Sequence, residues 1–139
     1  MEIRTLRQWD AGEILPLYDA VGWTNYTARP AMLADAFARS LCALGAYEEG
    51  RLVGLVRAVG DGSSVVLVQD LLVHPDFQRR GTGRALMRAL LGRFADVYQF
   101  LLLTDDTEAS VAFYRSLGLT PAGGIGCTAF VRIRPPQKP

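Results

Sequence analysis

The stretch Val73-His-Pro-Asp-Phe-Gln-Arg-Arg-Gly-Thr-Gly-Arg-Ala-Leu-Met87 decides the fold, because it joins a buried strand to an amphipathic helix. The apolar run that leads into it, residues 65–73, predicts a strand with two buried faces, interrupted by Gln69 and Asp70. After Gly83, apolar side chains recur at helical spacing, which predicts a helix ending near residue 94. The chain therefore turns sharply from strand to helix at residues 78–83.

This turn is suited to binding phosphate. Gly81 and Gly83 let the backbone turn tightly and approach a ligand without a Cβ in the way. The helix that follows presents unpaired N–H groups and the positive end of its dipole. Arginines supply further donors at positions 79, 80 and 84. By itself, however, a Gly-x-Gly pair is more typical of an ordinary loop beside a solvated arginine face.

Two other phosphate-binding motifs are excluded. A P-loop requires Gly-Lys-Ser/Thr, and the chain has no lysine before Lys138. A dinucleotide-binding fingerprint requires a third glycine where Leu86 stands. The two helices expected before the motif strand do not suit that fold either.

The flanking sequence predicts an α/β (α+β) fold, a mixed and mostly antiparallel sheet with helices on both faces. The element order is βααβββαβαββ. The expected strands are 1–6, 43–48, 52–59, 64–73, 97–104, 119–122 and 128–133. The expected helices are 11–20, 30–41, 83–94 and 106–117.

Composition excludes several classes of protein. The 139 residues suit one domain, and 50% hydrophobic with 21% charged residues argues against intrinsic disorder. A net charge of +1 is too small to attract the protein to nucleic acid or to an anionic membrane surface. No apolar run is long enough to span a bilayer. The two cysteines, Cys42 and Cys127, suggest small buried hydrophobes in a reducing cytoplasm and no disulfide framework.

The quoted stretch resembles the acetyl-CoA-binding motif of the GNAT (Gcn5-related) N-acetyltransferases, Gln/Arg-x-x-Gly-x-Gly/Ala between a strand and a helix. A second stretch, Ala112-Phe-Tyr-Arg-Ser-Leu-Gly-Leu119, resembles the later helix of that family, and the element order also matches. The resemblance implies a single GNAT domain over 1–134, with central strands that splay apart, followed by a frayed Pro-rich tail at 135–139. More locally, Val21-Gly-Trp23 is similar to serotonin N-acetyltransferase-like proteins, a match too short to assign a substrate.

The resemblance also implies a binding site for acetyl-CoA. The diphosphate would lie on backbone N–H groups near the turn, and the pantetheine arm would run along the end of the motif strand. A backbone N–H near Val73 would polarise the thioester carbonyl. Many members carry an asparagine where this chain has Thr107, whose shorter side chain puts that contact in doubt. The implied cofactor contacts are Leu71, Leu72, Val73, Gln78, Arg79, Arg80, Gly81, Thr82, Gly83, Arg84, Thr107, Ser110 and Tyr114.

Tyr114 is implied as the general acid that protonates the departing thiolate, because a phenol is a neutral donor at pH 7. Its spacing from Val111 and Leu117 is equally that of a core aromatic. Asp70 interrupts an apolar strand, where an unpaired carboxylate costs several kcal/mol. It is therefore expected either to serve the amine, as a base or by its charge, or to make a structural hydrogen bond.

The acceptor is expected near the loop 21–26, where Trp23 and Tyr26 would wall a pocket for an amine, with Asp70 nearby. Trp23 is as well suited to packing on the core. The function implied is acetylation of a primary amine on a small molecule by direct attack on the thioester, with no metal. The alternatives are a domain that senses acyl-CoA with little turnover and an enzyme that acetylates a protein or peptide. A homodimer is possible in this family, but the sequence locates no interface.

Overall fold

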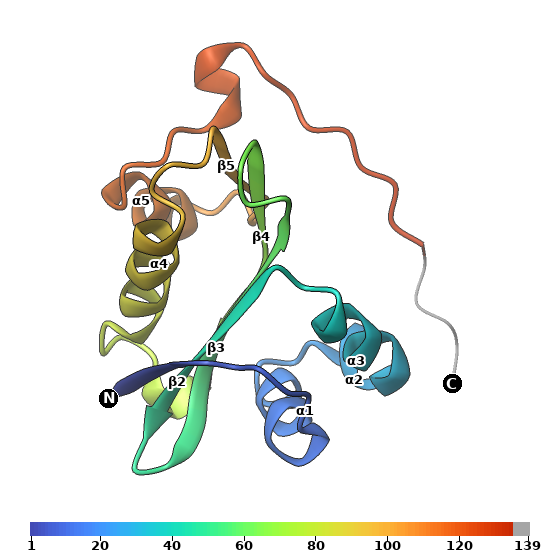
Figure 1. Cartoon of the computed structure of the whole chain (residues 1–139). Helices are drawn as coiled ribbons and strands as arrows, with labels where there is room; N and C mark the ends of the chain where they lie inside the picture. Colours follow the sequence, from blue (N-terminus) through green and yellow to red (C-terminus); the bar gives the residue numbers. More distant parts are fainter. Residues whose placement is uncertain (135–139) are drawn as a thin grey trace. The chain divides into compact units, whose positions relative to one another are not determined.

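The computed structural model describes residues 1–134, and the predicted tail at 135–139 lies outside them. Its sheet has five strands in the order β1-β2-β3-β4-β5 (Figure 1). Three neighbouring pairs, β1–β2, β2–β3 and β3–β4, are antiparallel, and β5 runs parallel to β4. The strands are β1 Glu2–Thr5, β2 Cys42–Glu48, β3 Arg51–Gly60, β4 Val65–Val73 and β5 Gln99–Leu102.

Residues 1–134 also form five α-helices and two 3₁₀ turns. The chain divides into two compact units, Met1–Leu103, which contains the whole sheet, and a second that begins at Thr104. Within the described residues, no helix is long and apolar enough to cross a membrane. The helices are α1 Ala11–Ala20, α2 Thr24–Thr27, α3 Pro30–Ala38, α4 Thr82–Arg93 and α5 Glu108–Ser116, and the turns are η1 Pro75–Phe77 and η2 Ala122–Ile125.

Helices of the first unit cover both faces of the sheet, as the sequence predicts. Successive side chains of a strand point to opposite faces. On β3, Leu55 is fully buried in a cluster with Ile14 and Leu17 of α1. The neighbouring Gly54 faces α4, because a Cβ built on it would lie 3.1 Å from Cγ2 of Thr82. Figure 1 shows α4 on one side of the strands and α1–α3 on the other.

β4 changes its pairing halfway along its length. Residues Val65–Val68 pair with β5, and β5 then ends. At the same point the register with β3 shifts, so that Gln69 has no partner there. An extra residue of this kind is a β-bulge, which bends the strand that contains it. The remaining five residues of β4 therefore continue beside β3 alone, which is the predicted splaying of the central strands.

Most predicted elements form within two residues of their expected ends, but three predictions are wrong. No strand forms at 119–122 or 128–133, where the described chain contains only η2. The alternating apolar residues there favour a strand, but a strand also needs a hydrogen-bonded neighbour; Phe130 is 94% exposed. Helix α2 was not predicted. β4 was predicted to be buried on both faces, but it is fully buried on one face only, since Gln69 is exposed.

Leu86 tests whether α4 is held by apolar packing. Its side chain is fully buried, so Leu86→Ala leaves a cavity and should lower the free energy of unfolding by about 2–5 kcal/mol. Urea denaturation followed by circular dichroism measures this. Leu101→Ala is the matched control, because Leu101 is 47% exposed and should change stability by less than about 0.5 kcal/mol. Equal losses in both variants would contradict the packing shown here.

Candidate functional site

The glycine-rich turn after β4 is built by two left-handed backbone positions. Arg79 has φ 62° and Gly81 has φ 82°, and Gly81 is the N-cap of α4. Residues that carry a side chain rarely adopt a φ in this left-handed region, so the backbone conformation at position 81 favours glycine. A Cβ on Gly81 would meet no atom within 4 Å, so the space beside the turn is open.

The amides of this turn are available to a ligand. The first helical hydrogen bond of α4 is Ala85 N–H to the Gly81 carbonyl, at 2.9 Å. Among residues 1–134, no backbone acceptor outside regular helices and strands receives the N–H of Arg79, Arg80 or Gly81. Such a row of donors at a helix N-terminus binds anions, and a diphosphate suits its length and charge.

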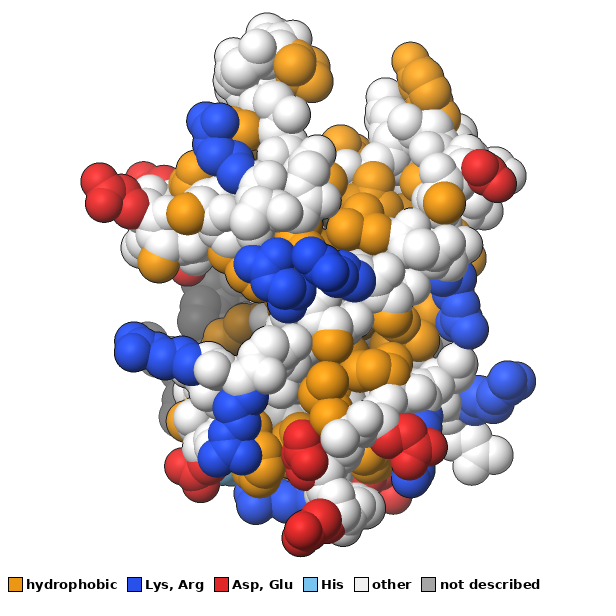
Figure 2. Space-filling view, turned by 90° about the vertical axis from the view of Figure 1, so that its left-hand side faces the viewer, with side chains coloured by type: hydrophobic (Ala, Val, Ile, Leu, Met, Phe, Trp, Pro, Cys, Tyr) orange, Lys and Arg blue, Asp and Glu red, His pale blue; other side chains and the backbone are white. Residues whose placement is uncertain are grey.

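Side chains fix the turn to the end of β4. Gln78 Nε2 donates to the Val73 carbonyl at 3.0 Å. The Arg80 guanidinium lies 5.1 Å from the centre of the Phe77 ring. Figure 2 shows the side of the molecule on which α4 lies, where basic side chains gather on the surface. Arg79 and Arg80 are exposed, while the Thr82 side chain is buried and leaves only its backbone to a ligand.

The second half of β4 presents its backbone along an open edge. His74 N–H donates to the Val53 carbonyl at 2.8 Å, which makes Val53 and His74 a hydrogen-bonded pair. Such pairs alternate along an antiparallel ladder. In this register the next one joins Leu55 to Leu72. The N–H groups of the intervening residues 71 and 73 therefore point away from β3, toward the side where β5 has ended.

The register separates Leu72 from Leu71 and Val73, the other two residues of β4 that were predicted to contact the cofactor. Leu72 directs its backbone groups to β3, and its side chain is only 3% exposed. It is therefore unsuited to pairing with a ligand along the edge. Leu71 and Val73 are suited to it, as predicted from the motif, although Gln78 already occupies the Val73 carbonyl.

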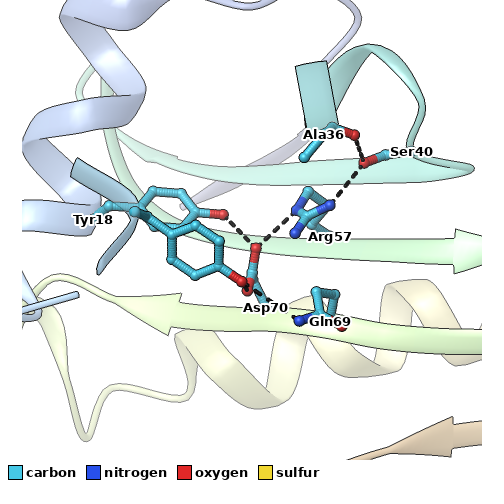
Figure 3. A network of polar contacts seen from close by, with 7 residues as sticks. Tyr18, Ala36, Ser40, Arg57, Gln69 and Asp70 are labelled. Atoms are coloured by element: carbon cyan, nitrogen blue, oxygen red, sulfur yellow. Dashed lines mark hydrogen bonds and ion pairs between the residues drawn. The ribbon is translucent and has the colours of Figure 1, made fainter. Parts of the chain in front are cut away.

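Asp70 is the centre of a buried polar network (Figure 3). Its Oδ2 accepts from Arg57 Nε and from the Tyr18 hydroxyl, each at 2.8 Å, and its Oδ1 accepts from the Tyr26 hydroxyl at 3.0 Å. The side chains of Asp70 and Arg57 are 2% and 4% exposed. These three donors favour the structural alternative for Asp70 over a role as a base.

The network reaches the N-terminal helices. Arg57 Nη1 donates to the Ser40 hydroxyl at 3.3 Å, and Ser40 donates to the Ala36 carbonyl at the end of α3. Burial, and then the charge of Asp70, raises the pKa of Tyr18, which keeps its phenol protonated. Asp70 and Arg57 therefore connect α1, α2 and α3 to the part of β4 that has lost its β5 partner.

Aromatic rings pack beside this network, and Trp23 and Tyr26 are both among them. Each is half-buried against the core, and their ring centres are 6.3 Å apart. Tyr18 lies 5.9 Å from Trp23 and 5.3 Å from Tyr26. Gln69, at the bulge, has its Nε2 3.5 Å from the Tyr26 hydroxyl. The structure thus brings Trp23, Tyr26 and Asp70 together at the bulge, as predicted.

Thr107, Ser110 and Tyr114 lie on or beside α5, in the second unit. Thr107 caps the helix, since its Oγ1 accepts from Ser110 N–H at 3.2 Å and donates to Asp105 Oδ1 at 2.6 Å. These bonds occupy the hydroxyl for which a cofactor contact is in doubt. Tyr114 is half-buried, and burial raises the pKa of its phenol.

Three residues that build this site were not predicted from the sequence as part of it. Arg57 interrupts apolar β3 as Asp70 interrupts apolar β4, and two opposite charges on neighbouring strands are a signal of a buried pair. Gly54 lets Thr82 approach the sheet, and a glycine inside a strand is a known sign of close approach. Tyr18 had no such signal, because its spacing is that of an ordinary core residue.

Comparison with known proteins identifies a family. The chain matches the model of the acetyltransferase (GNAT) family over residues 5–119. It is 42% identical to the GNAT family acetyltransferase SP0256 from Streptococcus pneumoniae TIGR4, with a TM-score of 0.87 that covers 96% of this chain and 97% of that one. This similarity confirms the predicted fold class.

Two named relatives are longer than this chain. The "Uncharacterized N-acetyltransferase ycf52" of Porphyra purpurea is 30% identical over 110 residues, 76% of this chain and 62% of that protein. "Histone acetyltransferase TAP1" of Glycine max is 33% identical over 125 residues, 78% of this chain and 51% of that protein. The chain thus spans between half and two thirds of the length of these relatives.

The buried pair can be tested by removing one charge. Asp70→Asn leaves the Arg57 guanidinium buried without its counter-ion and should lower the free energy of unfolding by about 3–5 kcal/mol. Asp35→Asn is the matched control, because its bond to Arg39 is on the surface and should be worth less than about 1 kcal/mol. Chemical denaturation of both variants gives the two values. A loss below about 1 kcal/mol for Asp70→Asn would rule out a structural role for the pair.

Proposed function

Because the chain belongs to the GNAT family of acetyltransferases, we propose that it transfers an acetyl group from acetyl-CoA to the primary amine of a small molecule. The observation that carries this proposal is the open edge of β4 running directly into the glycine-rich turn. Backbone donors would then face a ligand at Leu71 and Val73 and again at residues 79–83, with the paired residues 74–78 between them. An extended thioester that ends in a diphosphate matches such a line in shape and charge.

The turn would hold the diphosphate and β4 the extended arm. Backbone N–H groups of Arg79–Gly83 would bind phosphate oxygens, with the guanidinium groups of Arg79, Arg80 and Arg84 adding charge-assisted bonds. The N–H groups of Leu71 and Val73 would pair with the arm. One of them would hold the carbonyl oxygen of the thioester as negative charge develops on it.

The chemistry is direct attack of a neutral amine on the thioester carbonyl. A C–N bond forms, the C–S bond breaks, the nitrogen loses a proton and the sulfur gains one. Tyr114 is the proposed donor to the sulfur. Its raised pKa keeps the proton on the phenol at neutral pH, as a general acid requires.

The acceptor amine would bind beside the bulge. A carboxylate can only accept, so Asp70 requires the Tyr26 hydroxyl to donate to it. The Tyr26 oxygen then keeps lone pairs for an incoming N–H, next to the edge at Leu71. Trp23 would contact the apolar part of the substrate. This role for Asp70 is indirect, since it orients Tyr26 while its own oxygens stay occupied.

A protein or peptide amine is the second candidate acceptor, and the relative named histone acetyltransferase favours it. A domain that binds acyl-CoA with little turnover is the third, favoured by the absence of the family's asparagine at Thr107.

The free thiols of Cys42 and Cys127 support the proposed reducing, cytoplasmic location, although Cys127 is exposed and not buried as predicted.

Thiol release measured with Ellman's reagent tests the proposal. Purified protein with acetyl-CoA should release coenzyme A thiol when a panel of small primary amines is added, and mass spectrometry should show the acetylated amine. Release only with peptides would favour the second candidate. Tight acetyl-CoA binding without release from any amine would favour the third and refute the enzyme.

Tyr114→Phe should lower kcat about 10²–10⁴-fold, as loss of a general acid does, and leave the KM for acetyl-CoA nearly unchanged. Because the pKa of Tyr114 is raised, kcat of the parent should hold up to at least about pH 10 and decline only above it. The variant should lack that decline. Full turnover by Tyr114→Phe would assign the proton to another group or to solvent.

Gly81→Val tests the diphosphate site. The φ of 82° strains any β-branched residue, and the new side chain would occupy the open space beside the turn. The KM for acetyl-CoA should rise at least tenfold. Gly92→Val is the control, since Gly92 lies in the last turn of α4 and a Cβ there also meets nothing. Equal KM values for the two variants would show that the turn does not bind the cofactor.

A further inference from the structure

A pocket of about 250 Å³ is lined by none of the residues proposed above to bind the cofactor or the acceptor. It is lined by the first two turns of α1, by the turn between β2 and β3, and by His74 at the end of β4. Its apolar wall is formed by Pro16 with the buried Leu17 and Leu52. The volume is below the range of about 300–1,000 Å³ typical for drug-sized ligands, so it suits a smaller molecule.

Two hydrogen-bond donors meet on one wall of this pocket. His74 Nδ1 accepts from Asp76 N–H at 3.1 Å, which places the imidazole proton on Nε2. That Nε2 lies 3.2 Å from Nη2 of Arg51, and a guanidinium can only donate. Two donors that face each other at this distance lack an acceptor between them. A carboxylate would supply it, and with it a negative charge for Arg51.

Two acceptors line the same pocket. Pro16 lies inside α1 and has no N–H, so the Gly12 carbonyl lacks its usual helical donor. Glu13 follows it in the first turn and supplies a carboxylate, which also interacts with the Tyr47 hydroxyl and the Arg4 guanidinium. An ammonium group would satisfy the carbonyl and balance the charge of Glu13. The Asp76 carboxylate, 3.9 Å from His74 Nδ1, is 78% exposed and lies on the other side of the ring.

We propose that this pocket binds a free α-amino acid with an apolar side chain. The ligand carboxylate would bind Arg51 and His74 Nε2, its ammonium would bind the Gly12 carbonyl and Glu13, and its side chain would lie on Leu17 and Leu52. Each hydrogen-bond donor of the pocket then faces an acceptor of the ligand, and each acceptor of the pocket faces a donor. A peptide N-terminus lacks the carboxylate, and a fatty acid lacks the ammonium.

This ligand is not the acetyl acceptor. Attack on a thioester requires a neutral amine, whereas a carboxylate and a carbonyl oxygen stabilise the ammonium form. The pocket is also next to the turn that would hold the diphosphate. Arg51 lies 5.6 Å from the centre of the Phe77 ring, and Arg80 contacts the same ring at 5.1 Å.

Three molecules of nearly equal shape provide the test: L-leucine, L-leucinamide without the carboxylate, and 4-methylpentanoate without the ammonium. Isothermal titration into the full chain, without acetyl-CoA, should show leucine binding at least tenfold more tightly than either analogue. Equal affinity for leucine and one analogue would overturn the proposal. Because no turnover is measured, this result does not depend on the proposed enzyme activity.

Two variants locate the binding. Arg51→Gln should weaken leucine binding at least tenfold, while Arg39→Gln, at the exposed C-cap residue of α3, should leave it unchanged. Glu13→Gln should remove the preference for leucine over 4-methylpentanoate and keep its preference over leucinamide. Leucine affinity within twofold of the parent in Arg51→Gln would refute the site. Arg51-dependent formation of N-acetylleucine with acetyl-CoA would refute its assignment as a non-reacting ligand.

Discussion

The loss of pairing between β4 and β5 at Gln69 is the constraint on which the candidate site depends. Hydrogen bonds to β5 satisfy β4 only as far as Val68. Beyond the bulge, no strand within residues 1–134 pairs with the amides of Leu71 and Val73 on that side. A sheet normally avoids such an edge, because unpaired backbone groups attract other strands. Here the open edge leads into a turn whose amides are also unpaired, and both are explained if an extended anionic ligand binds along them.

A bent strand with one free edge needs support from its other side, and the buried pair of Asp70 and Arg57 provides it. The carboxylate lies one residue after the bulge and accepts from three donors on three different elements. Burying two charges is costly unless each is fully hydrogen-bonded, which is the case here. The pair fixes the tyrosines of α1 and α2 over the bulge. It therefore determines the shape of the acceptor region without needing to react.

The region between β4 and α4 would serve both of the proposed sites. His74 and Phe77 lie between the end of the strand and the glycine-rich turn, and Phe77 contacts an arginine from each side. Arg80 belongs to the proposed diphosphate site and Arg51 to the amino-acid pocket. The bulge, the 3₁₀ turn and the left-handed glycine thus lie on one continuous segment between residues 69 and 81.

The sequence by itself determined the order of the first nine predicted elements and the position of the glycine-rich turn. Both follow from local spacing: period two or 3.6 in apolar residues, and glycines where φ is positive. It also marked Asp70 as a charge that must find a partner. Only the tertiary structure decided that this partner is Arg57, that Tyr26 belongs to the same network, and that Gln69 is a bulge, because these depend on which residues of β3 and β4 lie opposite each other. The closing strands failed for the same reason: their apolar alternation is local, whereas a strand exists only where another strand accepts its hydrogen bonds.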